Sequence, residues 1–212
     1  FYGTLTVSAD GSYTYSVDSI SAAILKEGDI VNETFTYTVS DGSSSDNAEL
    51  MITITGVNDL PIASNNSGSV NEGESYDKTS TLGLLSNASD IDAGETLTIA
   101  TIRTGTKSDT GVNGVIGESL IGTYGTVNVS ADGSYSYSAN QEAANPLKQG
   151  DIVKETFTYS VTDGSSADSA ELTITISGVN DAPIAASNRG RVKEGKTYDK
   201  TTFKIRAKWH KN

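Results

Sequence analysis

The sequence predicts an all-β protein built from tandem antiparallel β-sandwich repeats with a period of 122 residues. Three observations lead to this fold class. Short segments alternate apolar or aromatic residues with Ser or Thr, Asp-Gly turns separate these segments, and much of the first quarter of the chain returns 122 positions later. Together these observations favour sheets that bury one face.

The alternating segments predict the strands. Period-two alternation with β-branched and aromatic enrichment is typical of a strand that packs one face on a core. We expect about seven strands in each repeat, and we expect the aromatic residues to pack in the core or across strands. The clearest strand segments are TLTVS (4–8), SYTYS (12–16), ETFTYTVS (33–40), AELMITIT (48–55) and ETLTIATIRT (95–104).

Asp-Gly turns lie between the predicted strands. ADGS occurs at 9–12 and 131–134, and DGSS occurs at 41–44 and 163–166. Glycine provides the positive φ that tight hairpin connections require, and Asp can accept hydrogen bonds from the turn amides. These turns therefore predict hairpins at the same place in both copies.

A shift of 122 residues aligns the chain with itself without a gap. Of the first 60 residues, 40 are identical to their partners, and NSGSVNEGESYDKT at 66–79 matches NRGRVKEGKTYDKT at 188–201. This register divides the chain at 1–59 (C-terminal half of a first repeat), 60–181 (a complete repeat), 182–202 (start of a third) and 203–212 (a divergent basic tail). Because the chain opens inside a strand pattern, we expect it to be a fragment of a longer array, in which each unit contacts mainly its neighbours.

The charge is unevenly distributed. The net charge is −12; residues 1–188 hold 6 basic and 25 acidic residues, whereas residues 189–212 hold 9 basic and 2 acidic ones. An acidic body disfavours nucleic acid and anionic lipid as partners and suits divalent cations. The alternative is a solvated acidic surface that keeps the protein soluble. No apolar run approaches the roughly 20 residues that span a bilayer, so we expect no membrane insertion.

The sequence gives little support for a catalytic motif, and we expect the protein not to be an enzyme. The single histidine, His210, lies in the divergent tail, so the repeats cannot form a Ser-His-Asp triad. The glycine-rich stretch at 105–123 lacks the Lys-Ser/Thr ending of a phosphate-binding loop, which favours an inserted surface loop.

Three motifs carry a family resemblance. YGTLTVSADGSYTYS, ETFTYTVSDG and ITGVNDLPIA, in this order, resemble the VCBS repeats of very large bacterial surface and secreted proteins. Those repeats are cadherin-like domains of the immunoglobulin-sandwich kind, and the resemblance covers nearly all of residues 1–202. It implies tandem immunoglobulin/cadherin-like sandwiches in a secreted or cell-surface protein.

The resemblance also implies calcium ligands at the junction between repeats. In cadherins the oxygens come from the linker, from a D-x-D pair in the next domain and from the Asp of an A-x-D turn. In this sequence the resemblance assigns the linker positions to Asn58 and Asp59. It assigns the D-x-D pair to Asp90 and Asp92, and the turn aspartate to Asp163. Calcium takes six to eight oxygen ligands, largely carboxylate and carbonyl. The alternative is that Asp90 and Asp92 make a polar turn and that Asp163 only accepts hydrogen bonds from local amides.

A second set of ligands falls at the far end of the complete repeat. Glu72 resembles the early cadherin glutamate, and its site would pair with Asn180 and Asp181 of the second linker. The linker reads GVND, where the cadherin form has an acidic residue before Val-Asn-Asp. One missing carboxylate implies weaker binding, at the extracellular end of the range near roughly 10⁻⁴–10⁻³ M, or fewer ions per junction.

Two functions follow from the resemblance. The first is a structural spacer in a long bacterial adhesin, with calcium stiffening the junctions and the neighbouring repeats of the same chain as partners. The alternative is a module that binds a glycan or another cell through the 105–123 loop. That loop contains no aromatic residue, which favours the spacer.

Overall fold

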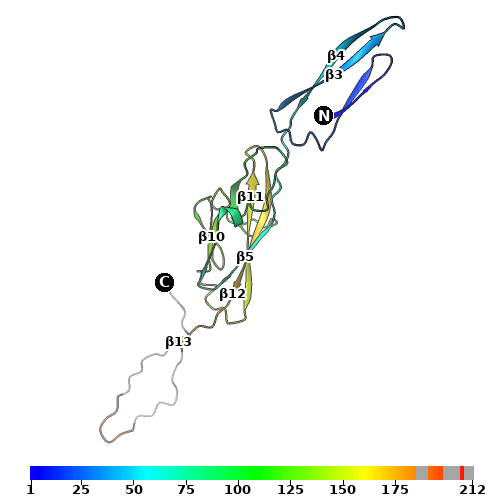
Figure 1. Ribbon diagram of the computed structural model, residues 1–212. Helices are drawn as coiled ribbons and strands as arrows, with labels where there is room; N and C mark the ends of the chain where they lie inside the picture. The colour runs from blue at the N-terminus through cyan, green and yellow to red at the C-terminus, as the bar shows by residue number, and fades with distance from the viewer. Residues whose placement is uncertain (185–190, 198–205, 208–212) are drawn as a thin grey trace.

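The computed structural model describes residues 1–184, 191–197 and 206–207 of the 212-residue chain. Residues 1–57 form one unit and residues 58–179 form a second, and the two lie end to end in an elongated molecule (Figure 1). The described part is nearly all β, as the alternating segments predict.

The first unit consists of two hairpins. Strand β1 (Gly3–Val7) pairs with β2 (Tyr13–Val17), and β3 (Ile30–Ser40) pairs with β4 (Ser45–Thr55), both antiparallel. Each connection contains an Asp-Gly pair whose glycine has a positive φ, 85° at Gly11 and 91° at Gly42. The predicted turns therefore form where the sequence places them.

The second unit is a complete sandwich of two four-stranded sheets. One sheet has the order β6-β10-β9-β8 and the other the order β5-β12-β11-β7. A single turn of 3₁₀ helix, η1 (Ser80–Leu82), follows β6. The strands are β5 (Asn66–Asn71), β6 (Ser75–Lys78), β7 (Thr98–Thr104), β8 (Ser119–Ile121), β9 (Thr126–Val129), β10 (Tyr135–Ser138), β11 (Ile152–Thr162) and β12 (Ala167–Ser177).

Two details of the sandwich differ from the prediction. The repeat has eight strands rather than about seven, and β8 lies within the 105–123 stretch that was expected to be a surface loop, so that expectation is wrong for residues 119–121. Every other strand pair in the described residues is antiparallel, but β5 runs parallel to β12, with Leu172 opposite Asn66 and Ser177 opposite Asn71. A short hairpin cannot join two parallel strands, because the chain must return to the same end of the sheet. Here the chain between β5 and β12 makes up most of the repeat. Hairpin signals in the sequence therefore could not reveal this pair.

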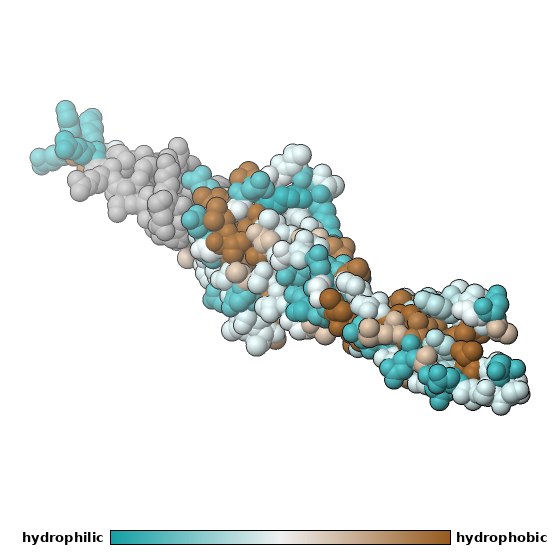
Figure 2. Space-filling model, turned by 90° about the horizontal axis from the view of Figure 1, so that it is seen from above, coloured by the Kyte–Doolittle hydropathy of each residue, from teal (hydrophilic) through white to brown (hydrophobic). Residues whose placement is uncertain are grey.

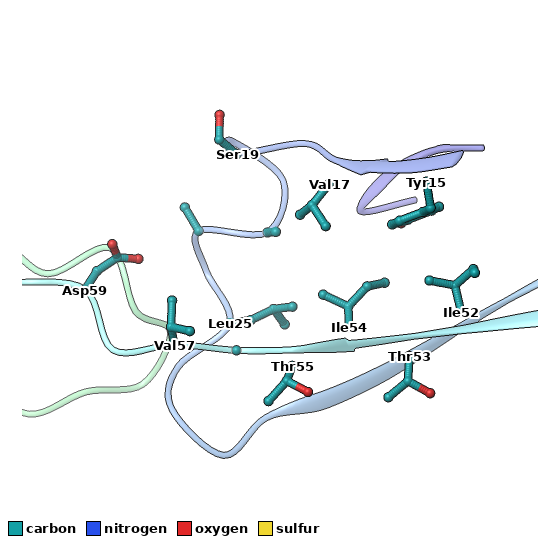
Figure 3. A pocket seen from close by; sticks show the side chains of 13 residues that line it. Tyr15, Val17, Ser19, Leu25, Ile52, Thr53, Ile54, Thr55, Val57 and Asp59 are labelled. Carbon is teal, nitrogen blue, oxygen red and sulfur yellow. The ribbon is translucent and has the colours of Figure 1, made fainter. Parts of the chain in front are cut away.

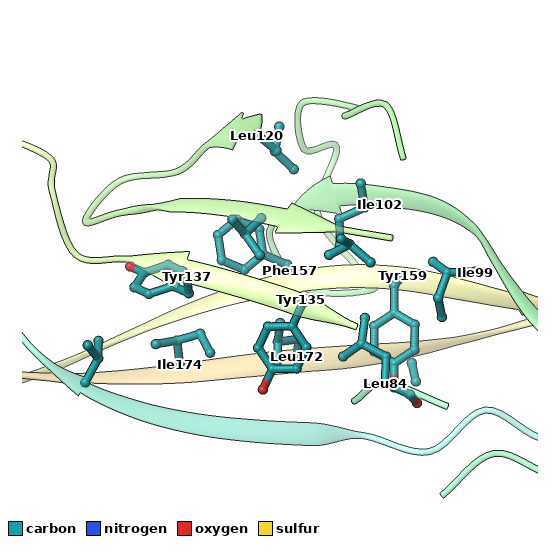
Figure 4. Close-up of a cluster of buried hydrophobic side chains, with 14 of the residues drawn as sticks. Leu84, Ile99, Ile102, Leu120, Tyr135, Tyr137, Phe157, Tyr159, Leu172 and Ile174 are labelled. Carbon is teal, nitrogen blue, oxygen red and sulfur yellow. The ribbon is translucent and has the colours of Figure 1, made fainter. Parts of the chain in front are cut away.

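The core of the second unit lies between its two sheets and is rich in aromatic side chains (Figure 4). Tyr137, Phe157 and Tyr159 have no exposed surface, and the rings of Tyr137 and Phe157 meet edge to face with centroids 6.1 Å apart. Aromatic pairs in this geometry add to the stabilisation from burial. The prediction that these aromatic residues pack in the core is confirmed in this unit.

In the first unit, the face of the strands that corresponds to this core is open to solvent. Tyr13, Tyr37 and Val39 remain 53%, 44% and 62% exposed, and apolar side chains gather between the two hairpins (Figure 2). A hollow of about 950 Å³ lies there, and a second of about 390 Å³ lies nearer the linker. In the second hollow, side chains of β2 face Ile52 and Ile54 of β4 (Figure 3).

Little of the C-terminal region is described. Strand β13 (Pro183–Ile184) pairs antiparallel with β14 (Arg206–Ala207). The rest of the predicted third-repeat start at 182–202 and of the basic tail at 203–212 lies outside the described residues, apart from 191–197. Across the described part of the chain, no helix has the length and apolar character needed to cross a membrane.

Candidate metal centre at the junction between the units

The GVND linker is held in place by backbone contacts at its glycine. Gly56 donates its N–H to the Asp29 carbonyl at 2.9 Å. A Cβ at Gly56 would meet the Lys26 carbonyl oxygen, and one at Gly178 would meet the Lys148 carbonyl oxygen. Only glycine permits so close an approach of two backbones, which explains why this residue occurs in both copies of the phrase.

Asn58 and Asp59 attach the linker to the second unit. The Asn58 amide nitrogen lies 3.2 Å from Asp163 Oδ2 and 3.0 Å from Ser166 Oγ. The Asp59 N–H donates to Asp92 Oδ2 at 2.9 Å. The structure thus brings together the linker, the D-x-D loop and the DGSS turn, which are 33 and more than 100 residues apart in the chain.

Asp90 and Asp92 present carboxylate oxygens without partners. The Asp92 N–H donates to Asp90 Oδ1 at 3.0 Å, and Asp92 is only 4% exposed. Within the described residues, Asp90 Oδ2 and Asp92 Oδ1 are both buried and accept no hydrogen bond. Burying an unpartnered polar atom is costly, and the cost is larger for an ionised group. Such a pair fits a cation that the oxygens can bind.

Asp163 is already well satisfied. Its Oδ1 accepts the Ser165 and Ser166 N–H groups at 2.6 and 2.7 Å, and its Oδ2 accepts the Ser166 hydroxyl at 2.8 Å. The Ser166 amide first, and then the other donors, hold the pKa of Asp163 well below its usual range despite partial desolvation. Asp41 forms the same turn in the first unit. The geometry therefore matches the Asx-turn alternative, and it also orients Asn58.

Contacts between the loops of the two units flank this cluster. Lys26 Nζ lies 3.2 Å from Glu95 Oε1, and the Ala93 N–H donates to the Ile24 carbonyl at 3.1 Å. The sequence prediction missed Lys26. A signal existed, because KEGD at 26–29 returns as KQGD at 148–151.

Glu72 lies at the opposite end of the second unit. It is 8% exposed, and its Oε1 accepts the N–H of Val179, next to Asn180 and Asp181. Burial raises the pKa of Glu72, and the negative charges of Asp181 and Asp151 raise it further. The structure thus places Glu72 beside the second linker and away from the first. Asp151 was missed, although it belongs to the repeated KQGD phrase.

Among the described residues, no three Asp, Glu, His or Cys side chains converge closely enough to form a metal site by themselves. A cation at the first junction would have to combine Asp90 and Asp92 with amide or main-chain oxygens of the linker. Calcium accepts such mixed oxygen ligands, whereas zinc prefers nitrogen and sulfur.

Residues 58–178 match the family model of the bacterial cadherin-like domain. The chain belongs to this family. The match confirms a cadherin-like bacterial domain, the coarser part of the resemblance; membership among the VCBS repeats stays a prediction.

A curated relative gives the same picture. The calcium-binding lectin RapA2 of Rhizobium johnstonii is 30% identical over 183 residues, which are 84% of this chain and 73% of the lectin. A bacterial cadherin-like domain with such a relative supports an extracellular, adhesin-like module.

Solved structures resemble the chain more distantly. Drosophila N-cadherin EC1–4 has a TM-score of 0.43 at 14% identity, covering 84% of this chain and 40% of that one. The endo-fucoidan hydrolase MfFcnA4 has a TM-score of 0.35 at 19% identity, covering 88% of this chain. The chain spans 24% of that hydrolase. Both TM-scores are low, so neither likeness bears on the activity of this chain.

Proposed function

We propose that this chain is a spacer segment of a secreted or surface-attached bacterial adhesin, in which calcium stiffens the junction between cadherin-like repeats. The observation that carries the proposal is the pair of buried, unpartnered oxygens, Asp90 Oδ2 and Asp92 Oδ1, beside the linker. A relative described as a calcium-binding lectin supports the choice of ion.

Each junction residue has its own part in this mechanism. Asp90 and Asp92 would hold the ion through their open oxygens, and Asn58 and Asp59 would supply linker oxygens. Asp163 holds the Asn58 amide and so orients the linker. When bound, calcium supplies the positive charge that relieves repulsion among these carboxylates. Two carboxylates about 5 Å apart repel by roughly 3 kcal/mol at an effective dielectric near 20.

The far end of the second unit would provide the complementary half of the next junction. Glu72, Asn180 and Asp181 would bind an ion together with loops of a following repeat. This assignment rests on the proposed division of the chain at residues 59 and 181. A third repeat would then begin at 182, and a divergent tail would run from 203 to 212. It also rests on the proposal that the repeats are of the VCBS type. The burial of Glu72 against Val179 supports it.

Calcium titration of the full chain tests the proposal. We expect calorimetry to detect binding, and we expect small-angle scattering to show that chelator broadens the distribution of molecular lengths. At a calcium concentration 100 times Kd, binding to the folded state adds about 2.7 kcal/mol to the free energy of unfolding.

The variant Asp90→Asn/Asp92→Asn should lose most of the heat of binding and the response to chelator. A matched control, Asp77→Asn/Glu118→Gln, removes two exposed carboxylates of the same unit and should bind as the parent does. If both double variants keep the calcium response, the assigned site is wrong. If chelator changes neither molecular shape nor thermal midpoint in the parent, calcium stiffening is wrong.

A second candidate function is glycan or cell binding through the 105–123 loop. The lectin relative favours carbohydrate as a partner, and Val112 and Val115 of this loop are 67% and 61% exposed. A glycan array probed with the full chain, and with a variant in which residues 106–117 are replaced by a short Gly-Ser linker, decides this candidate. Equal glycan binding by both proteins would exclude the loop.

A further inference from the structure

A polar hollow of about 520 Å³ lies on one open side of the second unit. It sits near β5 and β6, which are edge strands of opposite sheets, and near η1, which follows β6 in the chain. Its lining includes side chains from three separate segments: Asn65, Ser67, Lys78, Leu82, Asn87 and Tyr135. Its lining contains none of the junction carboxylates and no residue of the 105–123 stretch.

The chemistry of the lining is unusual for this protein. The chain has 27 acidic and 15 basic residues, yet the lining contains amides, hydroxyls, one ammonium group and no carboxylate. A surface without carboxylates does not attract a cation. It suits a ligand rich in hydroxyl groups that carries negative charge, because Lys78 is the one charged group of the lining.

The wall of the hollow is held in place from behind. The Asn66 amide donates to the Tyr159 hydroxyl at 2.8 Å and to the Ser64 carbonyl at 3.1 Å. Asn65 Oδ1 accepts the Glu171 N–H at 2.9 Å. This bond uses the oxygen of the Asn65 side chain and not its amide nitrogen. These contacts tie the start of β5 to the β11–β12 hairpin, so the groups that line the hollow sit on a rigid frame.

Several polar groups of the hollow are available to a ligand. Among the described residues, the Asn87 amide and the Ser67 hydroxyl form no hydrogen bond, and the Lys78 ammonium pairs with no carboxylate. Lys78 Nζ instead lies 5.4 Å from the centroid of the Tyr76 ring. The aromatic contact orients the Lys78 stem while its donors stay open. Leu82, 63% exposed, adds an apolar surface at the rim.

We propose that this hollow binds a saccharide unit that carries a carboxylate. Lys78 pairs with the carboxylate, and the amides of Asn65 and Asn87 bind ring hydroxyls, which both accept and donate hydrogen bonds. Leu82 contacts the C–H face of the sugar. Since no carboxylate lines the hollow, binding does not require calcium, which separates this site from the junction site.

Direct binding with the full chain tests the proposal. Calorimetry or NMR shift titration uses oligomers of glucuronate, galacturonate and mannuronate, with the neutral oligomers of glucose, galactose and mannose as matched probes. We expect at least one acidic oligomer to bind, with at least tenfold preference over its neutral counterpart and no change on adding chelator.

Two variants place the binding in the hollow. Lys78→Met keeps the aliphatic stem over Tyr76 and should weaken binding at least tenfold, and Asn87→Ala should weaken it several-fold. Lys154→Met, an exposed lysine of β11, is the matched control and should bind as the parent does. Unchanged circular dichroism and thermal midpoint establish that each variant is folded.

Three results would overturn the proposal. They are no binding of any acidic oligomer, equal binding of the acidic and neutral oligomers, and equal effects of Lys78→Met and Lys154→Met. A fourth result, loss of binding with chelator, would also overturn it, because it would assign the saccharide to a calcium-dependent site. None of these results depends on whether calcium stiffens the junction, so the two proposals fail separately.

Discussion

The four strands of the first unit return in the second unit as β9 to β12, but the two units bury them very differently. Tyr135 is 5% exposed in the second unit, whereas its counterpart Tyr13 is 53% exposed in the first; Tyr159 is fully buried, whereas Tyr37 is 44% exposed. The strands that complete the two sheets in the second unit, β5 to β8, have no counterparts within residues 1–57. Identical residues thus pack in a core only where the neighbouring strands are present.

Hairpin geometry does not share this dependence. In the first unit Ile30 pairs with Thr55, and in the second Ile152 pairs with Ser177, which is the same register 122 residues later. Register within a hairpin follows from the turn and the alternation of side chains. The comparison therefore separates local structure, which is the same in both units, from burial, which is not.

The largest expected difference concerns the core aromatic residues. Phe157→Ala should lower the free energy of unfolding of the second unit by about 3–5 kcal/mol, because it leaves a cavity between two closed sheets. Phe35→Ala should cost about 1 kcal/mol, since Phe35 is partly exposed and no closed core surrounds it. Native-state hydrogen exchange of β11–β12 and of β3–β4 measures each effect. Equal losses would show that the first unit is as well packed as the second.

A smaller difference is expected for a hydrogen bond present in both units. Tyr137 Oη donates to Glu155 Oε2, and Tyr15 Oη donates to Glu33 Oε2, each at 2.7 Å. Tyr137→Phe should cost about 1.5–3 kcal/mol, because the buried Glu155 carboxylate loses a donor. Glu33 is as buried as Glu155, but Tyr15→Phe should cost less, because Tyr15 is partly exposed and water can replace its hydroxyl, whereas Tyr137 is fully buried. Urea unfolding of the two variants measures both losses in the free energy of unfolding. A greater loss for Tyr15→Phe than for Tyr137→Phe would contradict this account.

The smallest effect is an alkaline titration in the first unit. Desolvation, and then the hydrogen bond and charge of Glu33, raise the pKa of Tyr15 to about 12, above its ordinary value of about 10. The stabilisation from its protonated hydroxyl is therefore complete below about pH 10 and is lost as the pH rises toward 12. Tyrosinate absorbance should show a step near pH 12 that Tyr15→Phe removes. An unchanged titration in that variant would assign the step elsewhere.

Much of the candidate site could be named from sequence, but its arrangement could not. The resemblance pointed to Asp90 and Asp92, and the structure places both beside the linker with unpartnered oxygens. It did not reveal that Asp163 accepts hydrogen bonds from its own turn as well as from Asn58, nor that Lys26 pairs with Glu95 across the junction. The repeated KEGD phrase marks Lys26, but nothing in the sequence shows that a loop residue pairs with Glu95 of another unit, which is why this pair was missed.

The sequence by itself determined the strands, the turns and the hairpin register, because these depend on neighbouring residues. Alternation selects the buried face, and Asp-Gly at 10–11 and 41–42 closes the hairpins. The tertiary structure alone decided the parallel pairing of β5 with β12 and the meeting of GVND with Asp92 and Asp163. It also decided which copy of the aromatic residues is buried, since burial needs strands from distant parts of the chain.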